Sequence, residues 1–374
     1  MHLAAFQRIA DRNGGNRAAG RPGYEASVRY VRQQLARAGY APRVSPFPFV
    51  EYTELVERAI QIAPRQRRLR VEAIDYSPST PKGGIRGRLV VSDDACEPGD
   101  LAGVSGHIAF AARGNCFIAA KAQNAARAGA RALVVFTTEP GPIDATLGDP
   151  RASTIPVVAI DRAVAASLST GRAVIRLQVT TRRRATTSQN VLADSRPGAP
   201  RMLVVGAHLD SVVAGAGIND NGTGVATILE IARVLRSTQP RLAVRFAFWG
   251  AEELGLIGSS AYVRTTGLDG VAGYLNFDML GTRGNLRAIY AGPYAEMWLR
   301  YFRAEGLRAQ VIDLSGRSDH FPFQQRGIPT GGLFAGTDLC YHAACDRLAG
   351  VNTRLLNELA AAAAFGVAEL APRS

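Results

Sequence analysis

The fold is decided by residues 202–210, Met202-Leu-Val-Val-Gly-Ala-His-Leu-Asp210, an apolar run that ends in a histidine and an aspartate. A glycine-rich loop follows, and a pattern of apolar residues at helical spacing then runs from about Asn221 to Arg236. The next run, Leu242-Ala-Val-Arg-Phe-Ala-Phe-Trp249, is almost continuously apolar, as is typical of a strand buried on both faces. This alternation predicts the α/β class, with a doubly wound mixed sheet and helices on both faces.

The chain upstream of this alternation has a different texture. Between about Val71 and Val179, short apolar runs of strand type are separated by turn residues, and the helix expected over 119–128 is ended by Gly129. We interpret this region as a smaller α+β, β-rich domain that is inserted into the main one. The expected division of the chain is an amino-terminal part over 1–70, the inserted domain over 71–185 and the main part over 186–374.

Both ends of the chain are expected to contribute helices. Apolar residues at helical spacing predict an amphipathic helix over 22–40, and the alanine-rich segment 355–370 predicts another at the carboxyl end. After the first helix, 44–56 and 59–63 are expected to be short extended runs that prolines interrupt.

Composition excludes several classes of protein. The chain has 374 residues, of which 47% are hydrophobic and 20% charged, which is typical of a globular protein. No apolar run reaches the roughly 18 residues of a spanning helix, so we expect no membrane partner. The net charge of +13 comes mainly from scattered arginines, with one tight cluster over 182–184, so we expect no nucleic-acid partner either. A monomer is expected.

The four cysteines form two pairs that are close in sequence, Cys96 with Cys116 and Cys340 with Cys345. An even number at close spacing favours disulfides and therefore a secreted protein, although no signal peptide follows Met1. The alternative is four buried thiols in a cytosolic protein. Neither pair has the Cys-x-x-Cys spacing of a zinc ribbon or a redox site.

Polar side chains stand where the apolar strands end. His208 and Asp210 end the first strand, Glu252 and Glu253 follow the second, and Asp278 ends a third apolar run. Because neighbouring parallel strands end at the same edge of a sheet, we expect these side chains to meet. Several carboxylates in one buried cleft would repel one another, so a divalent cation is expected between them.

Position suggests two more ligands. Asp220 lies in a glycine loop at the start of the next helix, and His342 lies between Cys340 and Cys345. The expected ligand set is His208, Asp220, Glu253, Asp278 and His342. It suits two zinc ions bridged by Asp220, since two imidazoles favour zinc over magnesium, while manganese or cobalt would also be tolerated.

The remaining polar residues receive other roles. We expect Asp210 to orient His208 and Glu252 to act as the general base that activates water. His320 is a rival ligand, although pocket lining is the favoured interpretation, and His2 and His107 are interpreted as structural. A Ser/His/Asp hydrolase is the competing chemistry, but the sequence has no Gly-x-Ser-x-Gly elbow.

These motifs resemble those of the secreted di-zinc aminopeptidases, a family that also contains glutamate carboxypeptidases, glutaminyl cyclases and the metal-free transferrin receptor. The motifs that carry the resemblance are Gly206-Ala-His-Leu-Asp-Ser211, Gly217-Ile-Asn-Asp-Asn-Gly222, Phe248-Trp-Gly-Ala-Glu-Glu-Leu-Gly255, Asn276-Phe-Asp-Met279, Ser318-Asp-His320 and Cys340-Tyr-His-Ala-Ala-Cys345. The inserted segment resembles a protease-associated domain through Cys96, Gly114-Asn-Cys116-Phe, Lys121 and Gly129-Ala-Arg-Ala-Leu-Val134.

The resemblance implies a zinc-dependent aminopeptidase that cleaves the amino-terminal peptide bond of peptides, with apolar residues as the expected preference. It also implies that Tyr341 polarises the scissile carbonyl, and it supports the ligand set and the base given above. The alternatives are a metallo-carboxypeptidase of the same fold, for which Arg283 or Arg317 could bind an acidic residue, and a non-catalytic receptor or binding module.

Overall fold

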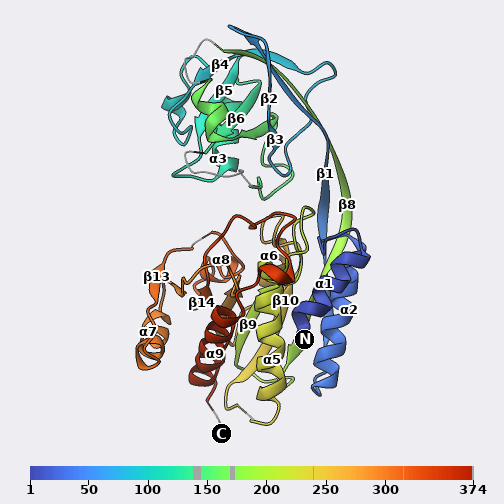
Figure 1. Ribbon diagram of the computed structural model, residues 1–374, viewed down its shortest axis with the longest axis vertical. Helices are drawn as coiled ribbons and strands as arrows, with labels where there is room; N and C mark the ends of the chain where they lie inside the picture. Colours follow the sequence, from blue (N-terminus) through green and yellow to red (C-terminus); the bar gives the residue numbers. More distant parts are fainter. Residues whose placement is uncertain (138–144, 169–172, 239, 315, 373–374) are drawn as a thin grey trace. The chain divides into compact units, whose positions relative to one another are not determined.

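A computed structural model describes residues 1–137, 145–168, 173–238, 240–314 and 316–372. The chain divides into two compact units, one formed by Met1–Phe49 with Thr186–Ser374 and the other by Val50–Ala185. Both boundaries fall inside long strands, β1 (Arg43–Ala63) and β8 (Val174–Asp194), which run from one unit into the other (Figure 1). The two extended runs expected over 44–63 are therefore one strand, because a strand tolerates proline wherever that position needs no N–H donor.

The first unit is built on a mixed sheet. Its strands lie in the order β13 (Gln310–Ile312), β12 (Ala288–Tyr290), β14 (Thr330–Phe334), β11 (Val271–Asp278), β9 (Met202–His208), β10 (Ala243–Trp249) and the end of β8. The central strand β9 is parallel to both of its neighbours, β10 and β11, whereas β8 is antiparallel to β10. The carboxyl ends of the three central strands therefore meet at one edge.

Helices cover both faces of this sheet, as the sequence predicts (Figure 1). One face packs against α1 (His2–Arg12), α2 (Pro22–Arg37), α5 (Gly224–Leu235), α7 (Ala295–Ala304) and α9 (Thr353–Leu370). The other face packs against α6 (Ile257–Thr265) and α8 (Phe321–Gln324). Successive side chains of one strand serve the two faces: Phe248 belongs to the first core and Trp249 to the second. Within the described part of the chain, each helix is too short or too polar to cross a membrane.

The second unit has its own sheet and its own core. Its strands lie in the order β4 (Ile85–Val91), β5 (Ile108–Ala112), β6 (Ala132–Phe136), β7 (Val157–Ile160) and β3 (Glu72–Ala73), and β2 (Arg67–Leu69) pairs with β1. The strands from β4 to β7 are parallel, and the helices are α3 (Ile118–Arg127), α4 (Arg162–Ala166) and the short η1 (Pro98–Leu101).

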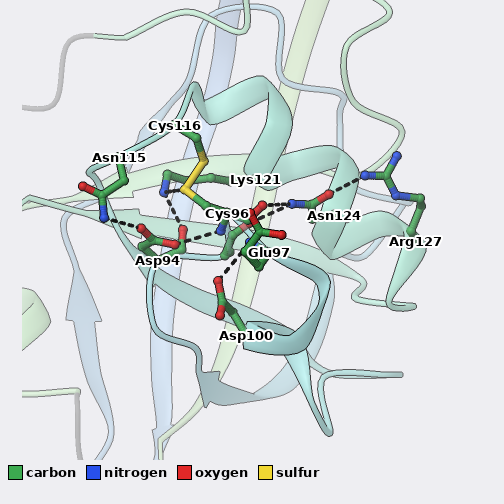
Figure 2. The surroundings of a disulfide bond; sticks show 10 residues. Asp94, Cys96, Glu97, Asp100, Asn115, Cys116, Lys121, Asn124 and Arg127 are labelled. Atoms are coloured by element: carbon green, nitrogen blue, oxygen red, sulfur yellow. Dashed lines mark hydrogen bonds between the residues drawn. A yellow bond between two sulfur atoms is a disulfide. The ribbon is translucent and has the colours of Figure 1, made fainter.

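The disulfide between Cys96 and Cys116 ties a loop of this unit to the start of α3. Figure 2 shows how α3 side chains hold that loop: Asn124 donates hydrogen bonds to the carbonyls of Ala95 and Cys96, at 3.1 and 2.7 Å, and Lys121 donates to the carbonyl of Asp94. These contacts give the disulfide a structural setting.

Candidate metal centre

The polar residues at the strand ends meet, because the register of the central strands aligns them. His208 is the last residue of β9 and lies opposite Trp249, the last residue of β10. Glu252 and Glu253 follow that strand after one tight turn, and Asp278 is the last residue of β11. His208 and Asp278 are 2% and 8% exposed, so this edge of the sheet carries titratable groups in a buried environment.

Asp220 lies between two imidazoles. Its Oδ1 is 3.0 Å from Nε2 of His208, and its Oδ2 is 3.2 Å from Nε2 of His342. On the first side, Oδ1 of Asp278 is 3.4 Å from the same nitrogen of His208. On the second side, Oε2 of Glu253 is 3.0 Å from Nε2 of His342. The cluster thus has two halves that share one carboxylate.

Two carboxylate oxygens in this cluster, Oε1 of Glu253 and Oδ1 of Asp278, are buried and have no hydrogen-bond partner among the described residues. A buried polar atom without a partner is costly, so each oxygen needs another kind of partner. The ligand atoms of His208, Asp220 and Glu253 lie within 4.8 Å of one another, as do those of His208, Glu252 and Asp278. The donor set and its spacing therefore fit a divalent cation of the type that imidazole and carboxylate bind.

The charges in the cluster shift one another's ionisation. Burial raises the pKa of Glu253 to about 7, and burial also raises the pKa of Glu252 well above its usual range despite the nearby His208. Burial alone would raise the pKa of Asp220, but hydrogen bonds from His208 and His342 outweigh it and lower that pKa. Burial alone would lower the pKa of His208, but Glu252 and Asp278 raise it well above its usual value. Without a cation, this site must therefore hold protons in place of the missing charge.

Asp210 lies under the cluster, fully buried. Its carboxylate accepts hydrogen bonds from the backbone N–H groups of Glu252 and Glu253, at 3.2 and 3.4 Å, so it fixes the turn that presents these two side chains. Its backbone carbonyl oxygen is 3.2 Å from Nδ1 of His208, whereas its carboxylate Oδ1 is 3.8 Å away. The contact with the imidazole therefore comes from the main chain of Asp210, and the side chain serves the glutamates.

The loop that carries His342 is closed by the disulfide between Cys340 and Cys345. The backbone of His342 has a φ of +52°, and the ring of Tyr341 stacks on the imidazole with 3.8 Å between the ring centres. A five-residue separation leaves little room for other arrangements, so the disulfide helps to aim this imidazole at Asp220.

Three residues beside the cluster were missed by sequence reasoning. Asp346 accepts hydrogen bonds from the N–H groups of Asn219 and Asp220 at 2.7 and 2.9 Å, and Ser318 donates to Oδ2 of Asp278 at 2.7 Å. Arg17 is fully buried next to the loop that precedes Asp220. Ser318 and Asp346 stand in or directly after quoted motifs, which is a usable signal, but Arg17 has none.

The other histidines lie outside both groups of ligand atoms. His320 packs edge-on against Tyr290 with 4.7 Å between ring centres, and burial lowers its pKa to about 4. His2 contacts the hydroxyl of Tyr30 at 2.7 Å and a carboxylate oxygen of Glu230 at 3.1 Å. His107 directly precedes β5, in the second unit.

Comparison with known proteins gives consistent matches. The family model described as peptidase family M28 matches residues 190–366, and the PA domain model matches residues 85–168. An aminopeptidase of Pseudomonas aeruginosa is 36% identical, covering 97% of this chain and 78% of its own length. A probable lipoprotein aminopeptidase of Mycobacterium tuberculosis is also 36% identical, covering 90% and 73%.

Solved structures extend these matches. The aminopeptidase from Aneurinibacillus sp. strain AM-1 has a TM-score of 0.84 and 30% identity, covering 100% of this chain and 94% of its own. A zinc aminopeptidase from Bacillus subtilis has a TM-score of 0.74 and 25% identity, covering 100% and 95%.

Proposed function

The chain belongs to peptidase family M28 with an inserted PA domain, and on this premise we propose a catalytic role for each residue of its metal centre. It is a zinc-dependent aminopeptidase, as its relatives in the family are named. The number of ions, the roles of single residues and the preferred substrate are the parts that we propose.

We assign two zinc ions to the centre. His208 and Asp278 would hold one ion, His342 and Glu253 the other, and Asp220 would bridge them. The observation that carries this assignment is that the two oxygens of Asp220 face two different imidazoles, at 3.0 and 3.2 Å. The unpartnered oxygens of Glu253 and Asp278 supply further ligand atoms, one on each side.

When bound, zinc lowers the pKa of a water molecule and polarises a carbonyl group. Glu252 is the base: its carboxylate takes a proton from the attacking water and returns it to the nitrogen of the leaving amine. Burial raises the pKa of Glu252, which suits a group that must both accept and donate that proton. Asp210 holds the backbone of Glu252, so the carboxylate is positioned before substrate arrives. Tyr341 donates its hydroxyl to the scissile carbonyl oxygen.

We propose peptides with a free amino terminus as substrates. Such substrates carry a positive charge, which the carboxylates of the centre attract, and this charge places the first peptide bond at the base. An apolar first residue is the proposed preference, with pocket walls from loops 282–286 and 314–318, of which residue 315 lies outside the described part. The disulfides suit an oxidising compartment, so we propose that the protein acts outside the cell as a monomer.

The test is a panel of aminoacyl p-nitroanilides against peptides that end in glutamate, with zinc-loaded and chelator-treated enzyme. We expect cleavage of the anilides, fastest for leucine and phenylalanine, and loss of activity on chelation. Cleavage of the glutamate peptides at their carboxyl end would identify a carboxypeptidase instead. A zinc-loaded sample that cleaves neither would identify a binding module.

A further inference from the structure

Arg17 is fully buried, in the segment that joins α1 to α2. A buried guanidinium is costly unless its N–H groups find acceptors. Its side chain donates to the carbonyl oxygens of Leu209, Ala216 at 2.9 Å and Gly217 at 2.6 Å. Its backbone N–H also donates to the hydroxyl of Ser211 at 2.9 Å. All these acceptors belong to a single loop far away in sequence.

This loop joins His208 to Asp220, and Arg17 binds it at both ends. Leu209 directly follows His208, and Gly217 lies three residues before Asp220. One planar guanidinium therefore bonds the chain beside the first imidazole and the chain before the shared carboxylate. The fork geometry of arginine allows this, because its donors point in fixed directions within one plane.

The contacts of Arg17 are with carbonyl groups and an aromatic ring. Among the described residues, no carboxylate oxygen lies within ion-pair distance of its guanidinium, whose carbon lies 5.0 Å from the centre of the Phe6 ring. A positive charge near a cation site repels the cation, so its electrostatic effect on zinc is unfavourable. If Arg17 acted on the centre through charge alone, its removal would tighten zinc binding. If it acts through the loop, its removal weakens zinc binding.

We propose that Arg17 is a positioning residue for the metal centre: it fixes the separation between His208 and Asp220 by holding both ends of the loop between them. The inference rests on the proposed ligand set. It assigns a role in ion binding to the amino-terminal segment, which contributes no ligand of its own.

The experiment compares Arg17→Lys and Arg17→Met with the wild type and with Arg12→Lys, which makes the same change at an exposed position of α1. Lysine keeps the charge but cannot reproduce the fork. Two quantities are measured: zinc affinity by competition with a chelating dye, and hydrogen exchange of the amides in 209–222 in metal-free protein.

Both Arg17 variants are expected to bind zinc about 10- to 100-fold more weakly, the usual loss when a residue that supports a ligand is changed. In Arg17→Lys the loop amides should exchange faster while the rest of the unit keeps its protection, and excess zinc should restore kcat. Arg12→Lys should match the wild type in all three measurements.

Wild-type zinc affinity and loop protection in Arg17→Lys would overturn the inference, as would tighter zinc binding by Arg17→Met. A wild-type protein that binds no zinc would overturn the proposed ligand set instead. The exchange data would then still decide whether Arg17 holds the loop.

Discussion

Glu252→Gln tests the assignment of the base. The two side chains have the same shape, so the substitution leaves no cavity, and the backbone of residue 252 stays bonded to Asp210. An amide cannot accept the proton of the attacking water. We therefore expect loss of turnover without loss of the site.

The size of the loss follows from the role. A positioned general base contributes about 10²- to 10⁴-fold to a rate, which corresponds to about 3–5 kcal/mol of activation free energy. The nearest oxygen of Glu252 is 4.0 Å from the nitrogen of His208, and the proposed ligand set does not include it. Zinc content should therefore stay at the wild-type level.

The matched control is Glu253→Gln, the same change at the neighbouring residue. Oε2 of Glu253 is 3.0 Å from His342, on the second side of the site. This variant should lose zinc from that side, and excess zinc should restore part of its activity. Both variants are assayed with a leucine p-nitroanilide, and bound zinc is measured by mass spectrometry after gel filtration.

The reasoning about Glu252 fails if its glutamine variant keeps more than a tenth of the wild-type kcat. It also fails if the variant loses zinc as Glu253→Gln does, because Glu252 would then be a ligand, as its nearness to His208 and Asp278 would permit.

Further predictions concern proton release, the proposed carbonyl-binding hydroxyl and the disulfides. Burial raises the pKa of Glu253 to about 7 in metal-free protein, so this carboxyl holds a proton at pH 6 that zinc binding must displace, but is already ionised at pH 8.5. Calorimetry in buffers of different ionisation enthalpy should show more proton release at pH 6, and equal release at the two pH values would contradict the shift. Tyr341→Phe should lower kcat about 10²-fold with zinc content unchanged, because it removes one donor to the developing oxyanion; steady-state kinetics that show an unchanged kcat exclude that role. Replacing Cys96 and Cys116 by alanine should lower the stability of the second unit by about 3 kcal/mol, since their separation of 20 residues closes a loop of intermediate length. Denaturant unfolding measures this change, and an unaltered midpoint would argue against it. Replacing Cys340 and Cys345 should weaken zinc binding more than it lowers stability, because this short loop aims His342; wild-type zinc affinity in the same dye competition would contradict this.

Much of the centre could be predicted from sequence, because parallel strands end at a common edge. Once His208, Glu253 and Asp278 stood at the ends of apolar runs, their meeting followed from the sheet. The glycine-rich loop likewise marked Asp220. These signals are local in sequence, and the fold only has to align them.

The remaining features depend on contacts between distant segments. Nothing in the amino-terminal segment distinguishes Arg17 from a surface arginine, since its acceptors lie more than 190 residues away along the chain. The start of α5 was also expected too early: the helix begins at Gly224, because Asp220 and Asn221 have non-helical backbone angles. Asp346, beyond the helix by more than 100 residues, holds the N–H of Asp220.

The spacing of His208 and Asp210 could not show which group of the aspartate faces the imidazole. A separation of two residues suits either the carbonyl or the carboxylate. Only the turn at Glu252 and Glu253 resolves it, because its N–H groups take up the carboxylate. Helical and strand periodicity contain no such information.

The most direct measurement is zinc per chain, determined together with aminopeptidase activity while zinc is returned to chelator-stripped protein. Cooperation of two imidazoles around one carboxylate predicts that zinc content rises to two per chain, with activity recovering as the ions bind. Full activity in stripped protein, or no zinc retained after gel filtration, would contradict it.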